Sequence, residues 1–100
     1  TGAKIADDAI DAEDYVDARF AMGSCYAEKR NYDEVIDLFG ALLDNFAMPT
    51  EMRIASLVSL GVGLYMNGEL KDARRRFQAG IDEHNLKKQS EYLDDRYSYF

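Results

Sequence analysis

One spaced pattern of large and small residues occurs twice in this 100-residue chain, and the two copies are 38 residues apart. The first copy consists of Gly23, Tyr26, Val35 and Phe39, and the second consists of Gly61, Leu64, Ala73 and Phe77. Each copy is surrounded by apolar residues that recur every three or four positions, which is the period of an amphipathic helix. A repeat of this length is typical of stacked helical hairpins. The sequence therefore predicts an all-α fold in which antiparallel helical hairpins stack as a short solenoid.

Two hairpins are expected, repeat 1 over residues 15–46 and repeat 2 over residues 50–84. Asn31 is expected to cap the second helix of repeat 1, because its side chain can accept a hydrogen bond from the first turn. Gly68 suits the left-handed conformation that ends many helices. Pro49 is the only proline and cannot continue a helix, so it separates the two repeats.

Flanking helices are predicted at both ends of the two repeats. Residues 3–13 carry alanine and isoleucine at helical spacing among aspartates. Residues 85–89 predict a loop, and residues 90–100 then form a C-terminal flanking or capping helix. In the helix that follows Gly68, five small or apolar side chains are expected to point inward: Leu70, Ala73, Phe77, Gly80 and Ile81. All these elements together predict a single domain over residues 1–100.

Charge is distributed unevenly along the chain, which has a net charge of −7. Residues 1–50 carry 4 basic and 11 acidic side chains, whereas residues 51–100 carry 8 of each. Duplex nucleic acid requires a basic surface, and the only dense basic run here is residues 74–76. The longest apolar stretch, residues 54–66, is shorter than the roughly 20 residues that a helix needs to cross a bilayer. The sequence therefore predicts neither a nucleic-acid partner nor a membrane span.

No set of residues predicts catalysis, a metal site or a cofactor. The chain has one cysteine, Cys25, and one histidine, His84. Cys25 occupies in repeat 1 the position that Gly63 occupies in repeat 2, so we expect a buried structural thiol. The acidic residues between positions 7 and 17 lack the turn residues of a calcium-binding loop. These residues favour a protein that is not an enzyme and that binds neither a metal nor a cofactor.

The repeated residues resemble the tetratricopeptide repeat, a 34-residue motif with the pattern W-x2-L-G-x2-Y, then A-x3-F, then P. The matching residues are Met22, Gly23, Tyr26, Val35, Phe39 and Pro49 in the first copy and Leu57, Leu60, Gly61, Leu64, Ala73 and Phe77 in the second. The glycine and the phenylalanine match in both copies, whereas Arg19 occupies the tryptophan position of the first. The four additional residues of the 38-residue period fit the loop at residues 47–50. The resemblance covers residues 15–85.

This resemblance implies a binding surface. In tetratricopeptide proteins the first helix of each hairpin lines a concave groove that holds a peptide or a partner helix. The residues on the matching helix faces here are Asp17, Phe20, Ser24 and Glu28 in repeat 1 and Val58, Val62, Tyr65 and Met66 in repeat 2. Apolar side chains bordered by carboxylates suit a partner with basic and hydrophobic side chains. A different interpretation stays open, in which the chain's own helices bury Val58 and Val62.

Together, the resemblance and the residue inventory predict a non-catalytic scaffold that binds a protein or peptide partner through a TPR-like groove. The alternative is a helical regulatory or assembly domain of a larger enzyme or signalling protein. Because about three repeats are usually needed for a stable array, two repeats with flanking helices predict either a longer array or self-association.

Overall fold

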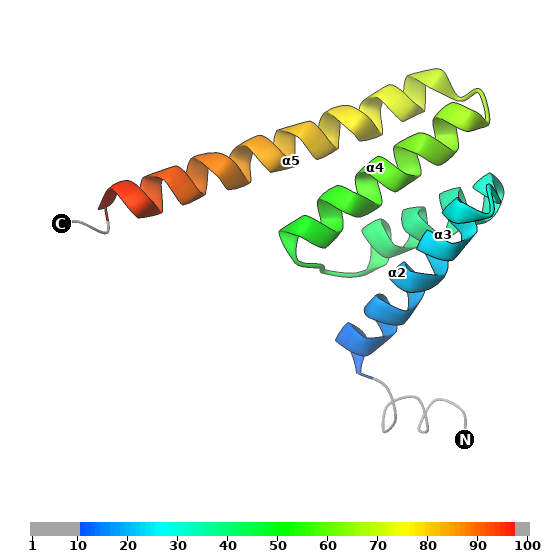
Figure 1. Cartoon of the computed structure of the whole chain (residues 1–100), viewed down its shortest axis with the longest axis horizontal. Coiled ribbons are helices and arrows are strands. Elements are labelled where there is room, and N and C mark those ends of the chain that lie inside the picture. The colour runs from blue at the N-terminus through cyan, green and yellow to red at the C-terminus, as the bar shows by residue number, and fades with distance from the viewer. Residues whose placement is uncertain (1–10, 98–100) are drawn as a thin grey trace.

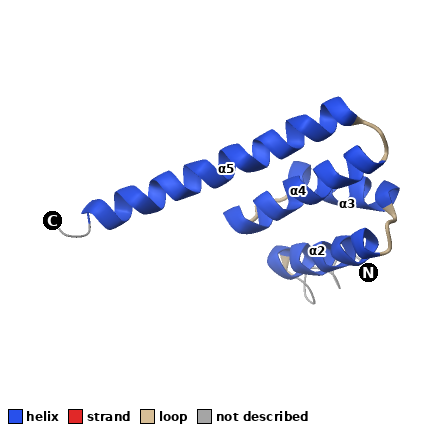
Figure 2. Ribbon diagram, turned by 45° about the horizontal axis from the view of Figure 1, so that its top comes forward, coloured by secondary structure: helices blue, strands red, loops and turns tan. Residues whose placement is uncertain are grey.

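The computed structural model describes residues 11–97, with side chains described up to residue 94. Within this range the chain forms four helices and no strand: α2 (Ala12–Glu28), α3 (Tyr32–Asn45), α4 (Thr50–Met66) and α5 (Leu70–Tyr97). Consecutive helices pack against each other and reverse direction (Figure 1). In Figure 2, α3 and α4 lie between α2 and α5. The predicted all-α class is confirmed for the described residues.

The 38-residue repeat of the sequence is also present in the helix boundaries. Helices α2 and α4 each have 17 residues, and they begin and end 38 positions apart. Helices α3 and α5 also begin 38 positions apart. We call α2 with α3 hairpin 1 and α4 with α5 hairpin 2. The flanking helix predicted at residues 3–13 lies outside the described residues except for its last three positions, two of which belong to α2.

The turns within the two hairpins share one backbone geometry. In hairpin 1, Arg30 has φ 61°, and the N–H of the next residue donates to the carbonyl of Tyr26 at 2.9 Å. In hairpin 2, Gly68 has φ 81°, and the next N–H donates to the carbonyl of Leu64 at 2.9 Å. Both turns are Schellman motifs, which confirms the prediction for Gly68. The cap predicted for the Asn31 side chain is wrong, because that side chain makes no capping hydrogen bond.

Each hairpin has a glycine at a tight contact between its two helices. A β-carbon built on Gly23 would lie 2.6 Å from the ring of Phe39, and one built on Gly61 would lie 2.6 Å from the ring of Phe77. Carbon atoms in contact normally lie 3.5–4.0 Å apart, so neither position has room for a side chain. Each phenylalanine ring therefore lies directly over the glycine of its own hairpin, and the two residues form one packing unit.

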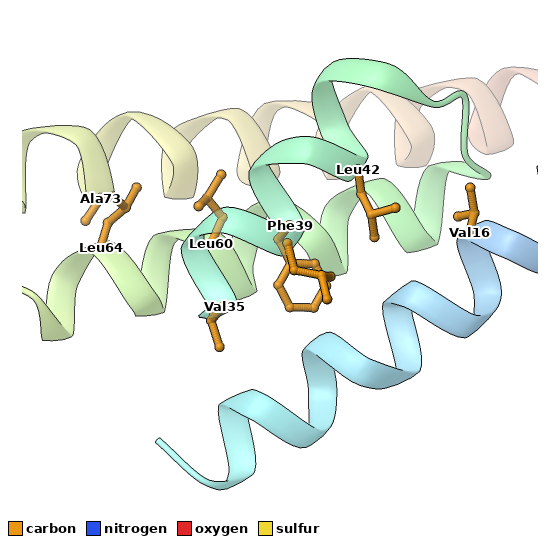
Figure 3. Close-up of a cluster of buried hydrophobic side chains, with 8 residues drawn as sticks. Val16, Val35, Phe39, Leu42, Leu60, Leu64 and Ala73 are labelled. Carbon is orange, nitrogen blue, oxygen red and sulfur yellow. The ribbon is translucent and has the colours of Figure 1, made fainter. Parts of the chain in front are cut away.

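The core lies where α3 and α4 meet their neighbours. Its buried apolar members, most of which Figure 3 labels, are Val16, Val35, Leu38, Phe39, Leu42, Leu60, Leu64 and Ala73. They come from all four described helices, and Phe39 is the largest of those with no exposed side-chain surface. Because α4 packs against both α3 and α5, it contributes more buried residues than the other helices. The apolar face of each hairpin is thus partly covered by the other hairpin.

The loop predicted at residues 85–89 is wrong, because α5 continues through it without a break. The helix predicted at residues 90–100 is therefore the C-terminal part of α5 as far as Tyr97, and residues 98–100 lie outside the described range. Residues 84–90 contain no glycine or proline, whereas Pro49 stops the equivalent continuation of α3. The 28 residues of α5 span about 42 Å, and its C-terminal end extends beyond the other helices (Figure 1).

Candidate partner-binding surface

The eight residues predicted to bind a partner occupy equivalent faces of α2 and α4. All are exposed except Phe20, which is half-buried. Val58 and Val62 are 43% and 42% exposed, so the interpretation in which the chain's own helices bury them is wrong. Tyr65 and Met66 are more exposed still, at 58% and 52%. On α4, therefore, the predicted surface consists of accessible apolar side chains.

On α2 the predicted residues mostly contact their own hairpin. The rings of Phe20 and Phe39 meet edge to face, with centroids 5.6 Å apart. Such a contact stabilises the hairpin, so Phe20 contributes to the core as well as to the surface. The Ser24 hydroxyl donates to the carbonyl of Phe20 at 3.1 Å, one helical turn earlier. Asp17 and Glu28 are exposed carboxylates at the two ends of this face.

Tyr65 lines an apolar groove of about 330 Å³ between α4 and α5. The seven lining residues are Tyr65, Leu70, Ala73, Arg74, Phe77, Gln78 and Ile81. Ala73 is buried, whereas Leu70 and Ile81 are 59% and 53% exposed. The prediction that Leu70 and Ile81 point inward is therefore wrong: both belong to the accessible part of the groove. Their apolar character at helical spacing indicated a packed face, but it did not indicate that no described helix covers that face.

A second hollow lies between the N-terminal part of α2 and the connection from α3 to α4. It has a volume of about 640 Å³ and is lined by Ala12, Glu13, Val16, Asp17, Asn45, Phe46, Ala47, Met48, Pro49 and Met52. Its apolar lining is bordered by the carboxylates of Glu13 and Asp17. This hollow contains Asp17 of the predicted set, whereas the groove contains Tyr65. Of the eight predicted residues, therefore, one lines each depression, and the other six line neither: Phe20, Ser24, Glu28, Val58, Val62 and Met66.

Two ion pairs fix α5 against α4. Arg53 donates to the two carboxylate oxygens of Glu83 over 2.8 and 3.4 Å, and this partly buried contact raises the pKa of Arg53. Nearer the C-terminus, the ammonium of Lys87 donates to the carboxylate of Glu51. That hydrogen bond raises the pKa of Lys87 and lowers the pKa of Glu51. Both contacts hold the helix that forms most of the groove.

The prediction of a buried thiol is wrong, because Cys25 is exposed. The equivalent residue, Gly63, is buried because α3 packs against that face of α4. No described helix precedes α2, so the same face of α2 has no covering within residues 11–97. Among these residues, no group of three or more histidine, cysteine, aspartate or glutamate side chains is placed to hold a metal ion.

The geometry defines a class, an all-α protein whose helices pack against one another as two equivalent hairpins. None of the described helices is both long enough and apolar enough to span a membrane. Comparisons of the chain with protein-family models, with curated proteins and with solved structures find no match.

Proposed function

We infer that this chain is a non-catalytic, TPR-like helical-repeat domain that binds a protein or peptide partner, and that the groove between α4 and α5 is its binding surface. The observation that supports this function is the exposure of three large apolar side chains around one depression. Tyr65, Leu70 and Ile81 are each more than half exposed, and buried Ala73 lies beneath them.

Exposed apolar side chains that gather around a groove favour binding, because a partner that covers them removes apolar surface from water. Full burial of a side chain of this size contributes roughly 1.5–3 kcal/mol. The groove is open along α5, so it suits an amphipathic helix or an extended segment. Arg74 on the rim of the groove favours a partner with carboxylates beside its apolar residues. The hollow at Asp17 suits the basic side chains of the partner that the sequence analysis predicts.

Three amphipathic helical peptides with one apolar face and either acidic, basic or uncharged polar faces provide the test. Each is titrated by calorimetry against dilute wild-type protein. We expect the acidic peptide to bind most tightly and Tyr65→Ala and Leu70→Ala to weaken its binding about tenfold each. Leu86→Ala is the matched control, because Leu86 is 65% exposed on the same helix but does not line the groove.

Two results would contradict this function. If the groove variants bind the peptide as tightly as the wild type does, the partner binds elsewhere. If the basic peptide binds most tightly and this preference depends on Asp17, the hollow is the binding site instead of the groove. Phe20→Ala is a poor probe, since the lost contact with Phe39 would also destabilise hairpin 1.

A further inference from the structure

We propose that the groove between α4 and α5 receives helix α2 of a second copy of this chain, so that hairpins continue from one molecule to the next. This assignment rests on the proposed function, in which the groove is a binding surface, and it names the occupant. An equivalent contact exists within the molecule, where α4 packs on α3 of hairpin 1. In the proposed contact, α2 of the second copy takes the position of α4 and α5 takes the position of α3.

The first argument is the match between the groove and the surface on which α4 packs. On hairpin 1, Gly63 of α4 approaches Tyr32, Val35 and Ile36 of α3. Ile36 and Gly40 also line a hollow together with two leucines of α4, Leu60 and Leu64. The four α3 residues become Leu70, Ala73, Arg74 and Gln78 when 38 is added to their numbers. All four of these line the groove.

The second argument is a face of α2 that no other helix covers among residues 11–97. The residues with which α4 meets hairpin 1 include Ser56, Leu60 and Gly63, and all three are buried. Their equivalents on α2 are Ala18, Met22 and Cys25, and all three are exposed. Met22 is 40% exposed, whereas its equivalent Leu60 is 3% exposed. A helix face of small residues around one long apolar side chain permits the close approach that the groove requires.

At one pair of positions, the residue sizes on the two surfaces compensate each other. Within the molecule a β-carbon on Gly63 would lie 3.1 Å from Val35, so this contact has little spare room. In the contact between copies, the larger Cys25 replaces Gly63 and the smaller Ala73 replaces Val35. Ala73 therefore leaves room for Cys25, while the longer Arg74 replaces Ile36, the other close neighbour of Gly63.

Charge also favours this pairing. Residues 12–28, which form α2, carry four carboxylates and one arginine, a net charge of −3. Residues 70–81 of α5 carry a net charge of +3, of which Arg74 lines the groove, whereas Asp72, Arg75 and Arg76 line the hollow beside α3. Opposite charges on two surfaces favour their encounter and disfavour pairing of either surface with itself.

The contact joins two different surfaces, so a pair of molecules keeps one free groove and one free α2 face. Such a heterologous contact extends into chains of molecules unless the geometry closes a ring. Small interfaces associate at protein concentrations of about 10 µM to 1 mM. Sedimentation velocity over this range should show a mean mass that rises beyond that of a dimer. A protein that stays monomeric throughout this range would overturn the proposal.

Two surface variants separate the two sides of the contact. Met22→Glu alters the α2 face and Leu70→Glu alters the groove, and we expect each alone to weaken association at least about tenfold. An equimolar mixture should form a 1:1 dimer and nothing larger, because only one intact groove and one intact α2 face remain per pair. Leu86→Glu should associate like the wild type. A mixture that stays monomeric, or a variant that associates normally, would refute the proposal.

One variant should strengthen the contact. Within the molecule, Asn67 donates to Asp33 at 2.8 Å, and the equivalent residues between copies are Lys29 and Lys71. These two cations would repel each other, so Lys71→Asp should tighten association about threefold to tenfold. Weaker or unchanged association of Lys71→Asp would count against the register that the repeat dictates.

The peptide titration distinguishes failure of this proposal from failure of the proposed function. A monomeric protein whose groove still binds the acidic amphipathic peptide would lack the second copy as its partner but keep the binding function. A monomeric protein with no groove-dependent peptide binding would remove both.

Discussion

The contact between glycine and phenylalanine in each hairpin leads to a quantitative prediction about Gly23→Ala. A β-carbon at Gly23 would lie 2.6 and 2.7 Å from two ring carbons of Phe39 and 2.8 Å from a methyl carbon of Leu38. Phe39 is fully buried and Leu38 is 4% exposed, so neither side chain can move towards solvent. The added methyl group must therefore separate α2 from α3.

Two opposing terms determine the size of the effect. Overpacking of a filled core costs roughly 1–3 kcal/mol. Alanine in a helix interior regains roughly 0.5–1 kcal/mol relative to glycine. The net change for Gly23→Ala is a loss of about 1 kcal/mol in the free energy of unfolding, within a range of roughly 0–2.5 kcal/mol. Gly40 is the matched control, because it lies inside α3 and a β-carbon there meets nothing within 4 Å. Gly40→Ala should gain about 0.5–1 kcal/mol.

Thermal and urea unfolding followed by far-UV circular dichroism would measure both variants at a protein concentration that keeps the chain monomeric. We expect the two melting temperatures to differ by roughly 10 °C, since 1 kcal/mol shifts a domain of this size by about 4–8 °C. The loss caused by Gly23→Ala should shrink in a Phe39→Leu background, where the ring is absent. If Gly23→Ala stabilises the protein as much as Gly40→Ala does, the ring contact is not what requires glycine at this position.

Three further predictions concern the turns and the surface. Arg30→Gly should raise the free energy of unfolding by about 0.5–1 kcal/mol, because Arg30 occupies a left-handed conformation that favours glycine. Gly68→Ala should lower it by about 1 kcal/mol, and unfolding by urea would measure both changes. Lys87→Gln should lower the melting temperature near pH 7 in low salt, because Lys87 lowers the pKa of Glu51 and so stabilises the folded state above the ordinary glutamate pKa. The difference from the wild type should vanish as the pH falls through the lowered pKa of Glu51, and a difference that persists in acid or in high salt would contradict the ion-pair explanation.

Much of the fold is predictable from the sequence because its signals are local. The spacing of apolar residues indicates helices, and Pro49 and Gly68 indicate where helices end. The repeat adds a second constraint, since equivalent residues at a separation of 38 define equivalent helices. Prediction fails at residues 85–89 because a mostly polar composition is compatible with both a loop and an exposed helix. The absence of glycine and proline there was the local signal for the helix.

The candidate site was less predictable. On α4, Val58, Val62 and Tyr65 are accessible, as a binding surface requires, but only Tyr65 of these lines the groove. The groove also depends on Leu70 and Ile81, which the pattern predicts to be inward. An apolar helix face indicates that something packs there, and the pattern is the same whether that neighbour belongs to this chain or to another molecule.

The sequence alone determined the helical class and the two positions at which helices must approach closely, because the period of apolar residues and the absence of a β-carbon act within a few residues. Only the tertiary structure decided which apolar faces stay uncovered. Cys25 and Gly63 occupy equivalent positions in equivalent helices, yet one is exposed and the other is buried. The difference arises because α3 packs against α4, while no described helix packs on the corresponding face of α2. Burial depends on the neighbour as well as on the residue, and neighbours are a property of the assembled fold.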